Sequence, residues 1–185
     1  MSYYLKDRIS WSEKDGARFI AIHSQIEPWL HGLLAGWIVL WLGVGVMIGW
    51  QLVGDFEYSD RERTFFVVFL AFWAYFLYKA VLAWAWRKWG KELIRVTPDA
   101  ITYKRDIRSY GRAHRYLRSN VSGIKKAEHG RFSFSGSYSM SFWVITGGSV
   151  QFQHLKKVIA VGLQLDESEA EQLAKLLSKP VRTKA

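Results

Sequence analysis

The chain has 185 residues, half of them hydrophobic and 16% aromatic, which is far too apolar for a disordered protein. It contains no cysteine, which excludes disulfide bonds, thiol catalysis and cysteine-based zinc or iron–sulfur sites. The formal net charge is +10, and the apolar and basic residues are concentrated in different parts of the sequence.

Residues 1–28 precede the first long apolar run, and we expect them in the cytoplasm or at a membrane interface. Two structures fit residues 8–27. Ser10 and Glu13 have the spacing of a capping box, which predicts an interfacial amphipathic helix. Lys14-Asp15-Gly16 instead has the composition of a hairpin turn that leads into a strand. The pattern leaves helix and hairpin both open.

Two long apolar runs follow. Residues 29–53 contain no Asp, Glu, Lys or Arg, and residues 64–86 contain a single charged residue, Lys79. Each run exceeds the roughly 20 residues that a helix needs to cross the apolar core of a bilayer. A helix also satisfies its own backbone hydrogen bonds in lipid. We therefore predict a two-helix transmembrane hairpin over residues 29–87.

The distribution of Lys and Arg sets the expected orientation. The short link between the spans has only Arg61 and Arg63, whereas the N-terminal segment and the segment after the second span are both richer in Lys and Arg. The positive-inside rule then places both termini in the cytoplasm. We predict a multi-pass protein of the bacterial inner (cytoplasmic) membrane.

Two features of the spans invite a functional interpretation. Lys79 is either part of a functional pathway or a side chain that reaches the cytoplasmic headgroups, and we favour the second interpretation. Small residues allow close contact between helices, so we predict a packing surface on the first span. Its glycines are Gly32, Gly36, Gly45 and Gly49.

Residues 90–180 change to short alternating runs separated by turn residues, which is typical of an all-β unit. A C-terminal helix over 166–179 follows, with Asp166 as its N-cap and Glu169 three residues later. Residues 181–185 form a tail. The expected strands are 91–97, 100–106, 111–118, 121–128, 141–146, 149–155 and 157–163.

Seven strands followed by one helix resemble the layout of a pleckstrin-homology-like (PH-like) domain, an antiparallel β-barrel with a C-terminal helix. The residues that carry the resemblance are "ELIRVTPDAITYKR" (92–105) and "VIAVGLQLDESEAEQLAKLL" (158–177). With the two spans, the chain resembles small bacterial membrane proteins with PH-like cytoplasmic domains and, in architecture only, the photosystem assembly factor Ycf4. The resemblance covers about half of the chain and implies a fold and an interaction role, not a chemistry.

Most of the positive charge lies directly after the second span. Residues 87–131 contain thirteen Lys or Arg and four Asp or Glu, which accounts for nine of the ten net charges. Such a segment can hold the domain on anionic lipid, contact an acidic protein, or form a specific phosphate site. The residues expected for that lipid, phosphate or acidic-partner contact are Lys104, Arg105, Arg108 and Arg112. No nucleic-acid-binding motif accompanies them, and we expect no nucleic-acid partner.

The stretch "RFSFSGSYSMSFWV" (131–144) alternates apolar side chains with serine, as a strand with one apolar face does. We expect its C-terminal part to belong to the core. The turn region near Gly136 would expose an aromatic tip, and exposed aromatic side chains mark contact surfaces. The predicted partner-contacting residues are Phe132, Phe134 and Tyr138.

No motif for catalysis, cofactor binding or metal ligation is present, and the five histidines are scattered. We therefore expect no enzyme activity, no catalytic residues, no cofactor and no metal. The expected function is that of an accessory subunit or assembly factor of a larger inner-membrane complex, such as a respiratory or photosynthetic one, with other membrane subunits and anionic lipids as partners. The alternative is a membrane-anchored module that binds anionic lipid headgroups through a basic face.

Overall fold

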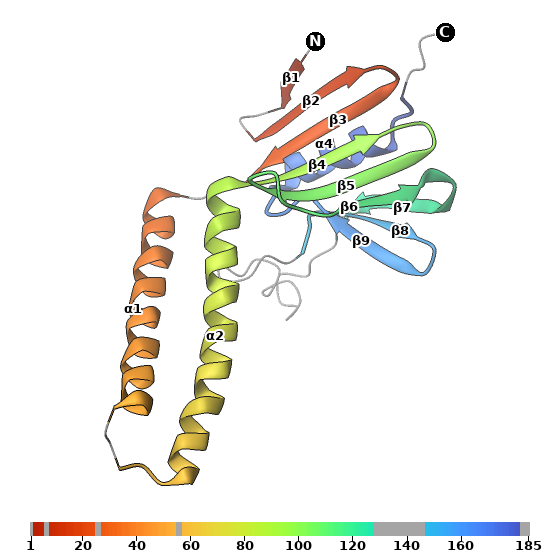
Figure 1. The fold of residues 1–185 in the computed structure, drawn as a ribbon. Coiled ribbons are helices and arrows are strands. Elements are labelled where there is room, and N and C mark those ends of the chain that lie inside the picture. The colour runs from red at the N-terminus through yellow and green to blue at the C-terminus, as the bar shows by residue number, and fades with distance from the viewer. Residues whose placement is uncertain (1, 6–7, 25–26, 55–56, 128–146, 182–185) are drawn as a thin grey trace.

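A pair of long helices carries a β domain at one end (Figure 1). The computed structural model describes residues 2–5, 8–24, 27–54, 57–127 and 147–181. A six-stranded antiparallel sheet has its strands in chain order. These strands are β1 (Ser2–Leu5), β2 (Ile9–Lys14), β3 (Ala17–His23), β4 (Gly90–Val96), β5 (Ala100–Ile107) and β6 (Ala113–Leu117).

A second, three-stranded antiparallel sheet and a helix complete the domain. Its strands are β7 (Val121–Lys126), β8 (Val150–His154) and β9 (Lys157–Val161), with a short 3-10 helix η1 (Arg118–Asn120) before β7. Helix α4 (Glu167–Ser178) packs on this sheet. Both sheets and α4 contribute to one core, in which Ile94, Phe152 and Leu173 are buried.

The predicted PH-like barrel is not confirmed, since the two sheets of the described residues do not close into a barrel. The ladder of strand pairs stops at β6 and starts again at β7, because η1 redirects the chain between them. The antiparallel strands and the C-terminal helix are confirmed. The expected strand over 141–146 lies outside the described residues.

The N-terminal segment forms a hairpin, not a helix. Asp15 and Gly16 both have positive φ values, 51° and 66°, as a tight two-residue hairpin turn requires. The spacing of Ser10 and Glu13 therefore caps no helix, since both residues lie in β2. Strand β3 then pairs with β4, with Ile20 opposite Ile94. The segment before the helices is thus part of the same sheet as the chain after them.

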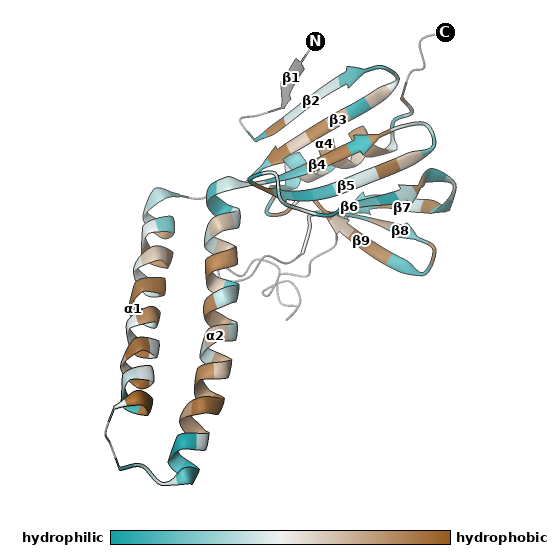
Figure 2. Ribbon diagram, in the orientation of Figure 1, coloured by the Kyte–Doolittle hydropathy of each residue, from teal (hydrophilic) through white to brown (hydrophobic). Residues whose placement is uncertain are grey.

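The two long helices are α1 (Pro28–Val53) and α2 (Asp60–Trp89), and both are long and apolar enough to cross a membrane. At about 1.5 Å per residue they extend for about 39 and 45 Å. Figure 2 shows the hydrophobic colour along both helices and hydrophilic residues at the start of α2. There Ser59 and Glu62 form a complete capping box.

One glycine allows a close contact between α1 and α2. A Cβ atom at Gly45 would lie 2.1 Å from the ring of Trp73, so only glycine leaves room for that indole. The Trp73 indole N–H donates to the Trp41 carbonyl oxygen at 2.8 Å. Of the four glycines predicted to pack, the other three, Gly32, Gly36 and Gly49, have no described atom within 4 Å of an added Cβ.

Replacing Gly45 with leucine is expected to destabilise the helix pair by about 1–3 kcal/mol, because the new side chain collides with Trp73. Gly49→Leu is the matched control, since it adds the same side chain to open space. Thermal unfolding of the detergent-solubilised protein, followed by tryptophan fluorescence, measures both variants. Equal midpoints for the two variants would contradict the described helix contact.

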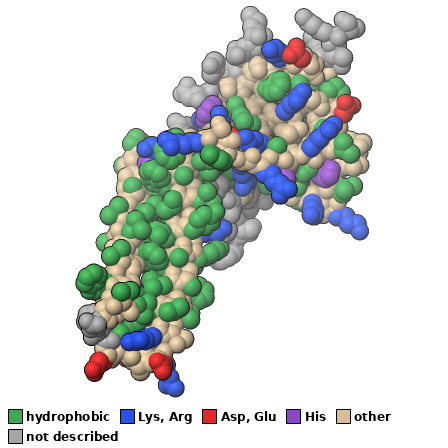
Figure 3. Space-filling view, in the orientation of Figure 1, with side chains coloured by type: hydrophobic (Ala, Val, Ile, Leu, Met, Phe, Trp, Pro, Cys, Tyr) green, Lys and Arg blue, Asp and Glu red, His purple; other side chains and the backbone are tan. Residues whose placement is uncertain are grey.

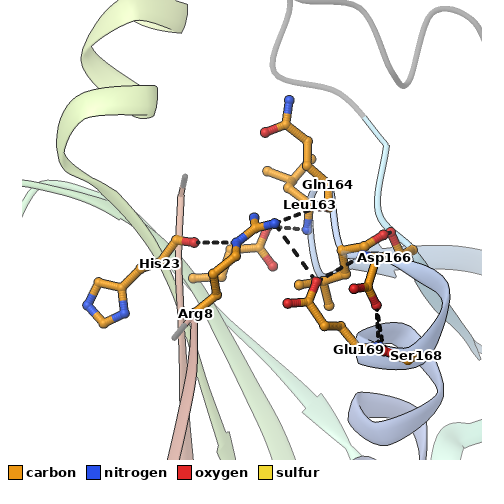
Figure 4. A network of polar contacts seen from close by, with 10 residues as sticks. Arg8, His23, Leu163, Gln164, Asp166, Ser168 and Glu169 are labelled. Carbon is orange, nitrogen blue, oxygen red and sulfur yellow. Dashed lines mark hydrogen bonds and ion pairs between the residues drawn. The ribbon is translucent and has the colours of Figure 1, made fainter. Parts of the chain in front are cut away.

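Arginines hold both ends of α4. Its N-cap residue Asp166 forms the predicted capping box with Glu169, and Arg8 lies 3.9 Å from the Glu169 carboxylate (Figure 4). Arg8 also donates to the carbonyl oxygen of Gln164 at 3.0 Å. At the other end Arg18, only 2% exposed, donates to the carbonyl oxygens of Leu176 and Lys179. A cation at these carbonyls complements the helix dipole.

Candidate functional site

The candidate site is the face of the six-stranded sheet that points away from α4, which we call the outer face. Successive residues of a strand point to opposite faces. Ile20, Ile94 and Ile101 point into the core, so their neighbours in sequence form the outer face. Figure 3 shows Lys and Arg side chains spread over the β domain on the side that faces the viewer.

Strand register sorts the outer face into cross-strand rows. The first row contains an aromatic side chain and two exposed arginines. The Arg95 guanidinium lies 5.4 Å from the centroid of the Phe19 ring, a cation–π distance. This contact fixes one cation at the centre of the face. The residues of the row, from β2 to β6, are Ser12, Phe19, Arg95, Thr102 and Arg115.

The second row is made mostly of small residues and forms the floor of a shallow groove of about 400 Å³. Most of the accessible surface of this groove is apolar. The residues of this row, from β2 to β6, are Ser10, Ala21, Leu93, Lys104 and Ala113.

The third row lies nearest the helices and contains a buried carboxylate between two lysines. Lys104 Nζ is 2.6 Å from the Asp106 carboxylate and Lys91 Nζ is 3.7 Å from it. The hydrogen bond from Lys104, with help from the Ser109 amide and the charge of Lys91, lowers the pKa of Asp106 below its ordinary value. Lys91 of this row and Lys104 of the second row share one carboxylate, so the two rows together keep a net positive charge.

The four residues predicted to bind phosphate do not converge. Lys104 lies on the outer face, whereas its neighbour Arg105 points to the inner side, where its Nε donates to the Tyr103 hydroxyl at 2.7 Å. Arg108 lies against Trp89 of α2, with 3.8 Å between its guanidinium and the ring centroid. Arg112 is exposed in the segment before β6. The structure therefore separates Lys104, on the outer face, from Arg105 and Arg108.

Other predicted functional residues lie elsewhere. Phe132, Phe134 and Tyr138 are outside the described residues. Lys79 lies on an exposed part of α2, with its Nζ atom 5.6 Å from the centroid of the Tyr75 ring. That ring is one turn nearer the start of α2, so the ammonium group is directed away from the expected cytoplasmic end.

Sequence reasoning missed a buried polar cluster at the inner side of β4 and β5. Glu92 is 1% exposed and accepts hydrogen bonds from the backbone N–H groups of Gly162, at 2.7 Å, and Leu163, at 3.0 Å. Burial raises the pKa of Glu92, although both amides, Arg105 and Tyr103 oppose the shift. Burial and the Glu92 charge also raise the pKa of Tyr103. The alternation could have revealed Glu92, because it occupies a core position of β4.

The cluster joins the two sheets and does not open onto the outer face. Glu92 connects β4 to the segment after β9, and Arg105 donates to the Gly147 carbonyl oxygen just before β8. Among the residues that the structure describes, no group of three His, Asp or Glu side chains could hold a metal ion. The outer face offers cations and a shallow apolar groove, an arrangement suited to binding an acidic surface.

Comparisons with known proteins give no further guidance, because no family, no curated protein and no solved structure matches the chain.

Proposed function

We propose that the protein is a non-catalytic integral membrane protein that acts as an accessory subunit or assembly factor of a larger membrane complex. In this proposal α1 and α2 lie in the bilayer and the outer face binds an acidic surface of another membrane protein. The observation that carries the proposal is the insertion of the helix pair between two neighbouring strands of the basic sheet. Ser24 N–H donates to the Gly90 carbonyl oxygen at 3.0 Å, where the chain leaves and re-enters the sheet.

In this proposal the insertion brings the outer face close to the bilayer surface. The His23–Lys91 pair is the last pair of the β3–β4 ladder before the helices begin. Strand β4 follows α2 without an intervening loop, since α2 ends at Trp89 and β4 begins at Gly90. A protein embedded in the same bilayer can therefore contact the helices and the outer face together.

The helices supply apolar surface for such a complex. They bury a small patch against one another around Leu34, Ile38 and Ala80. Most of their large hydrophobic side chains stay exposed, as in a membrane-spanning segment that lipid or another subunit covers. Examples of these exposed side chains are Val39, Leu40, Val46, Met47, Phe65 and Phe72.

The outer face combines exposed cations with a mostly apolar groove, and this combination favours a protein over lipid headgroups as its ligand. An acidic protein surface can reach the whole face, and the apolar groove gives it a contact that headgroups do not use.

We place the protein in the bacterial inner membrane with both termini in the cytoplasm. The clusters of Lys and Arg on the β-domain side of both helices support this orientation.

We also propose that the β domain is related to PH-like domains. The support is that its antiparallel sheets precede a C-terminal helix.

The full-length protein is expected to stay in the membrane fraction after an alkaline carbonate wash and to co-purify with at least one other membrane protein in mild detergent. Mass spectrometry of the purified material identifies that protein. Chemical crosslinking in intact membranes before extraction controls for association in the detergent. Recovery in the soluble fraction, or as a monomer both with and without crosslinking, would contradict the proposal.

A further inference from the structure

A second groove, distinct from the outer face, lies where α2 meets β5. We call it the junction groove, and it has a volume of about 640 Å³. Its walls are almost entirely apolar on the helix side and carry two guanidinium groups on the sheet side. Its lining includes Leu82, Ala85, Trp86 and Trp89 of α2, together with Arg105 and Arg108.

The helix side of the groove faces away from α1. Positions 82, 85, 86 and 89 follow the i, i+3, i+4, i+7 spacing of one helix face. Ala80 and Trp84, which pack with α1, lie on the opposite side of α2. The groove therefore opens toward the surroundings of the helix pair, where lipid chains run along a membrane helix.

The sheet side of the groove is basic. A tight turn between Ile107 and Tyr110 brings Arg108 over the face of Trp89, 3.8 Å from its centroid. On the same ring, Lys88 Nζ lies 4.9 Å from the centroid. Trp89 is thus in contact with two cations at the last turn of α2. No Asp or Glu is among the described residues that line the groove.

We propose that the junction groove binds one phospholipid with an anionic headgroup. One acyl chain lies along Leu82, Ala85 and Trp86, and the headgroup phosphate accepts hydrogen bonds from Arg108 and Arg105. The location argues for a lipid, because the groove lies at the end of an apolar 30-residue helix, at the level that headgroups occupy. No carboxylate lines the groove, so its two guanidinium groups select an anionic headgroup. Arg105 also donates to Tyr103 and Gly147 and contributes its remaining N–H groups and its charge, whereas Arg108 can bind the phosphate bidentately.

This inference rests on the proposed membrane location but not on a protein partner. The outer face and the junction groove share no described residue. Lys104 belongs to the outer face, and Arg105, the next residue in sequence, belongs to the junction groove. Two surfaces with separate ligands also explain why Lys104 is separated from Arg105 and Arg108.

The test uses the full-length protein in mild detergent and native mass spectrometry. The probes are phosphatidylglycerol and phosphatidylcholine with identical acyl chains. The wild-type protein is expected to retain one phosphatidylglycerol about fivefold to thirtyfold more strongly than phosphatidylcholine, as one or two cations near a headgroup predict. Arg108→Gln should remove most of this preference and leave phosphatidylcholine retention unchanged.

Ala85→Phe keeps every charge but fills the apolar part of the groove, so it should weaken retention of both lipids. The matched control is Arg115→Gln, which removes one exposed cation from the outer face and should bind like wild type. Soluble glycerol phosphate is added as a competitor. It should not displace the lipid, because it lacks the chain.

Equal retention of the two lipids by the wild-type protein would overturn the inference. So would wild-type retention by both Arg108→Gln and Ala85→Phe, or displacement by glycerol phosphate, which would indicate a phosphate site only. A co-purifying polypeptide that crosslinks to a photoreactive residue at position 85 would assign the groove to a protein instead. Recovery of the protein in the soluble fraction would contradict the proposed function itself. A membrane-bound protein without lipid preference would contradict only the lipid site, so the two failures are distinguishable.

Discussion

Changing Arg95 and Arg115 together to glutamate is expected to detach the protein from its partner while leaving it in the membrane. Both side chains are exposed in the first row of the outer face, so the change replaces two positive charges with two negative ones without altering the core. Like charges placed across an interface cost several kcal/mol. At about 1.4 kcal/mol per tenfold change, we expect a loss of affinity of about 100-fold or more.

Quantitative co-purification in mild detergent measures this effect, with the thermal midpoint as a check on folding. The matched control changes Lys156 and Lys157, two exposed lysines at the β8–β9 turn, to glutamate. Both double variants have the same net charge, but only the first acts on the outer face. Partner recovery that falls equally in both would show a general charge effect and remove the outer face as the binding site.

Salt offers an independent check of the same surface. Exposed charges interact less as the Debye length shortens, from about 10 Å at 0.1 M to about 3 Å at 1 M salt. Partner recovery by the wild-type protein should therefore decrease as salt increases. Association that does not depend on salt would mean that the apolar groove or the helices provide the contact.

Patterns within short stretches of sequence predicted the helices, but they did not decide between a helix and the β2–β3 hairpin in residues 8–27. Charge-free runs and the Asp166 capping box are complete within one stretch of sequence, and the structure has these elements as expected. In residues 8–27, Phe19 and Ile22 do not alternate cleanly. The reason is that Ile22 points into the core, whereas Phe19 lies on the outer face against Arg95.

The candidate site depends on contacts between residues far apart in the sequence, which patterns within short stretches cannot predict. Its outer face forms only because β3 pairs with β4 across the entire helix pair, from His23 to Lys91. Closeness in sequence misled the phosphate-site prediction for a related reason. Lys104 and Arg105 are adjacent, and adjacent residues of a strand point to opposite faces.

Removing the buried Glu92 carboxylate is expected to destabilise the β domain strongly. Glu92→Ala leaves the backbone N–H groups of Gly162 and Leu163 without their acceptor, and each unsatisfied buried group costs about 1–3 kcal/mol. We expect a loss of about 3 kcal/mol in the free energy of unfolding at pH 7. Glu92→Gln keeps one acceptor oxygen and should cost less.

The same carboxylate predicts a direction for the pH dependence of stability. Burial raises the pKa of Glu92 in the folded state above its ordinary value of 4.5. The folded protein therefore keeps this proton at pH values at which the unfolded chain has lost it. The stabilisation linked to the Glu92 proton is fully present below about pH 4.5 and is lost as the pH rises through the folded-state pKa of Glu92.

Glu92→Gln cannot titrate, so its stability should vary less than that of the wild-type protein as the pH rises above 4.5. The pKa of Asp106 is lowered in the folded protein, so its contribution to stability is lost only as the pH falls below about 4. It therefore does not change between pH 4.5 and 8. Thermal unfolding from pH 4.5 to 8 compares both proteins, with Glu171→Gln on the exposed side of α4 as the control. Parallel pH profiles for wild type and Glu92→Gln would mean that the cluster keeps Glu92 ionised in the folded protein, through its two amide donors and Arg105.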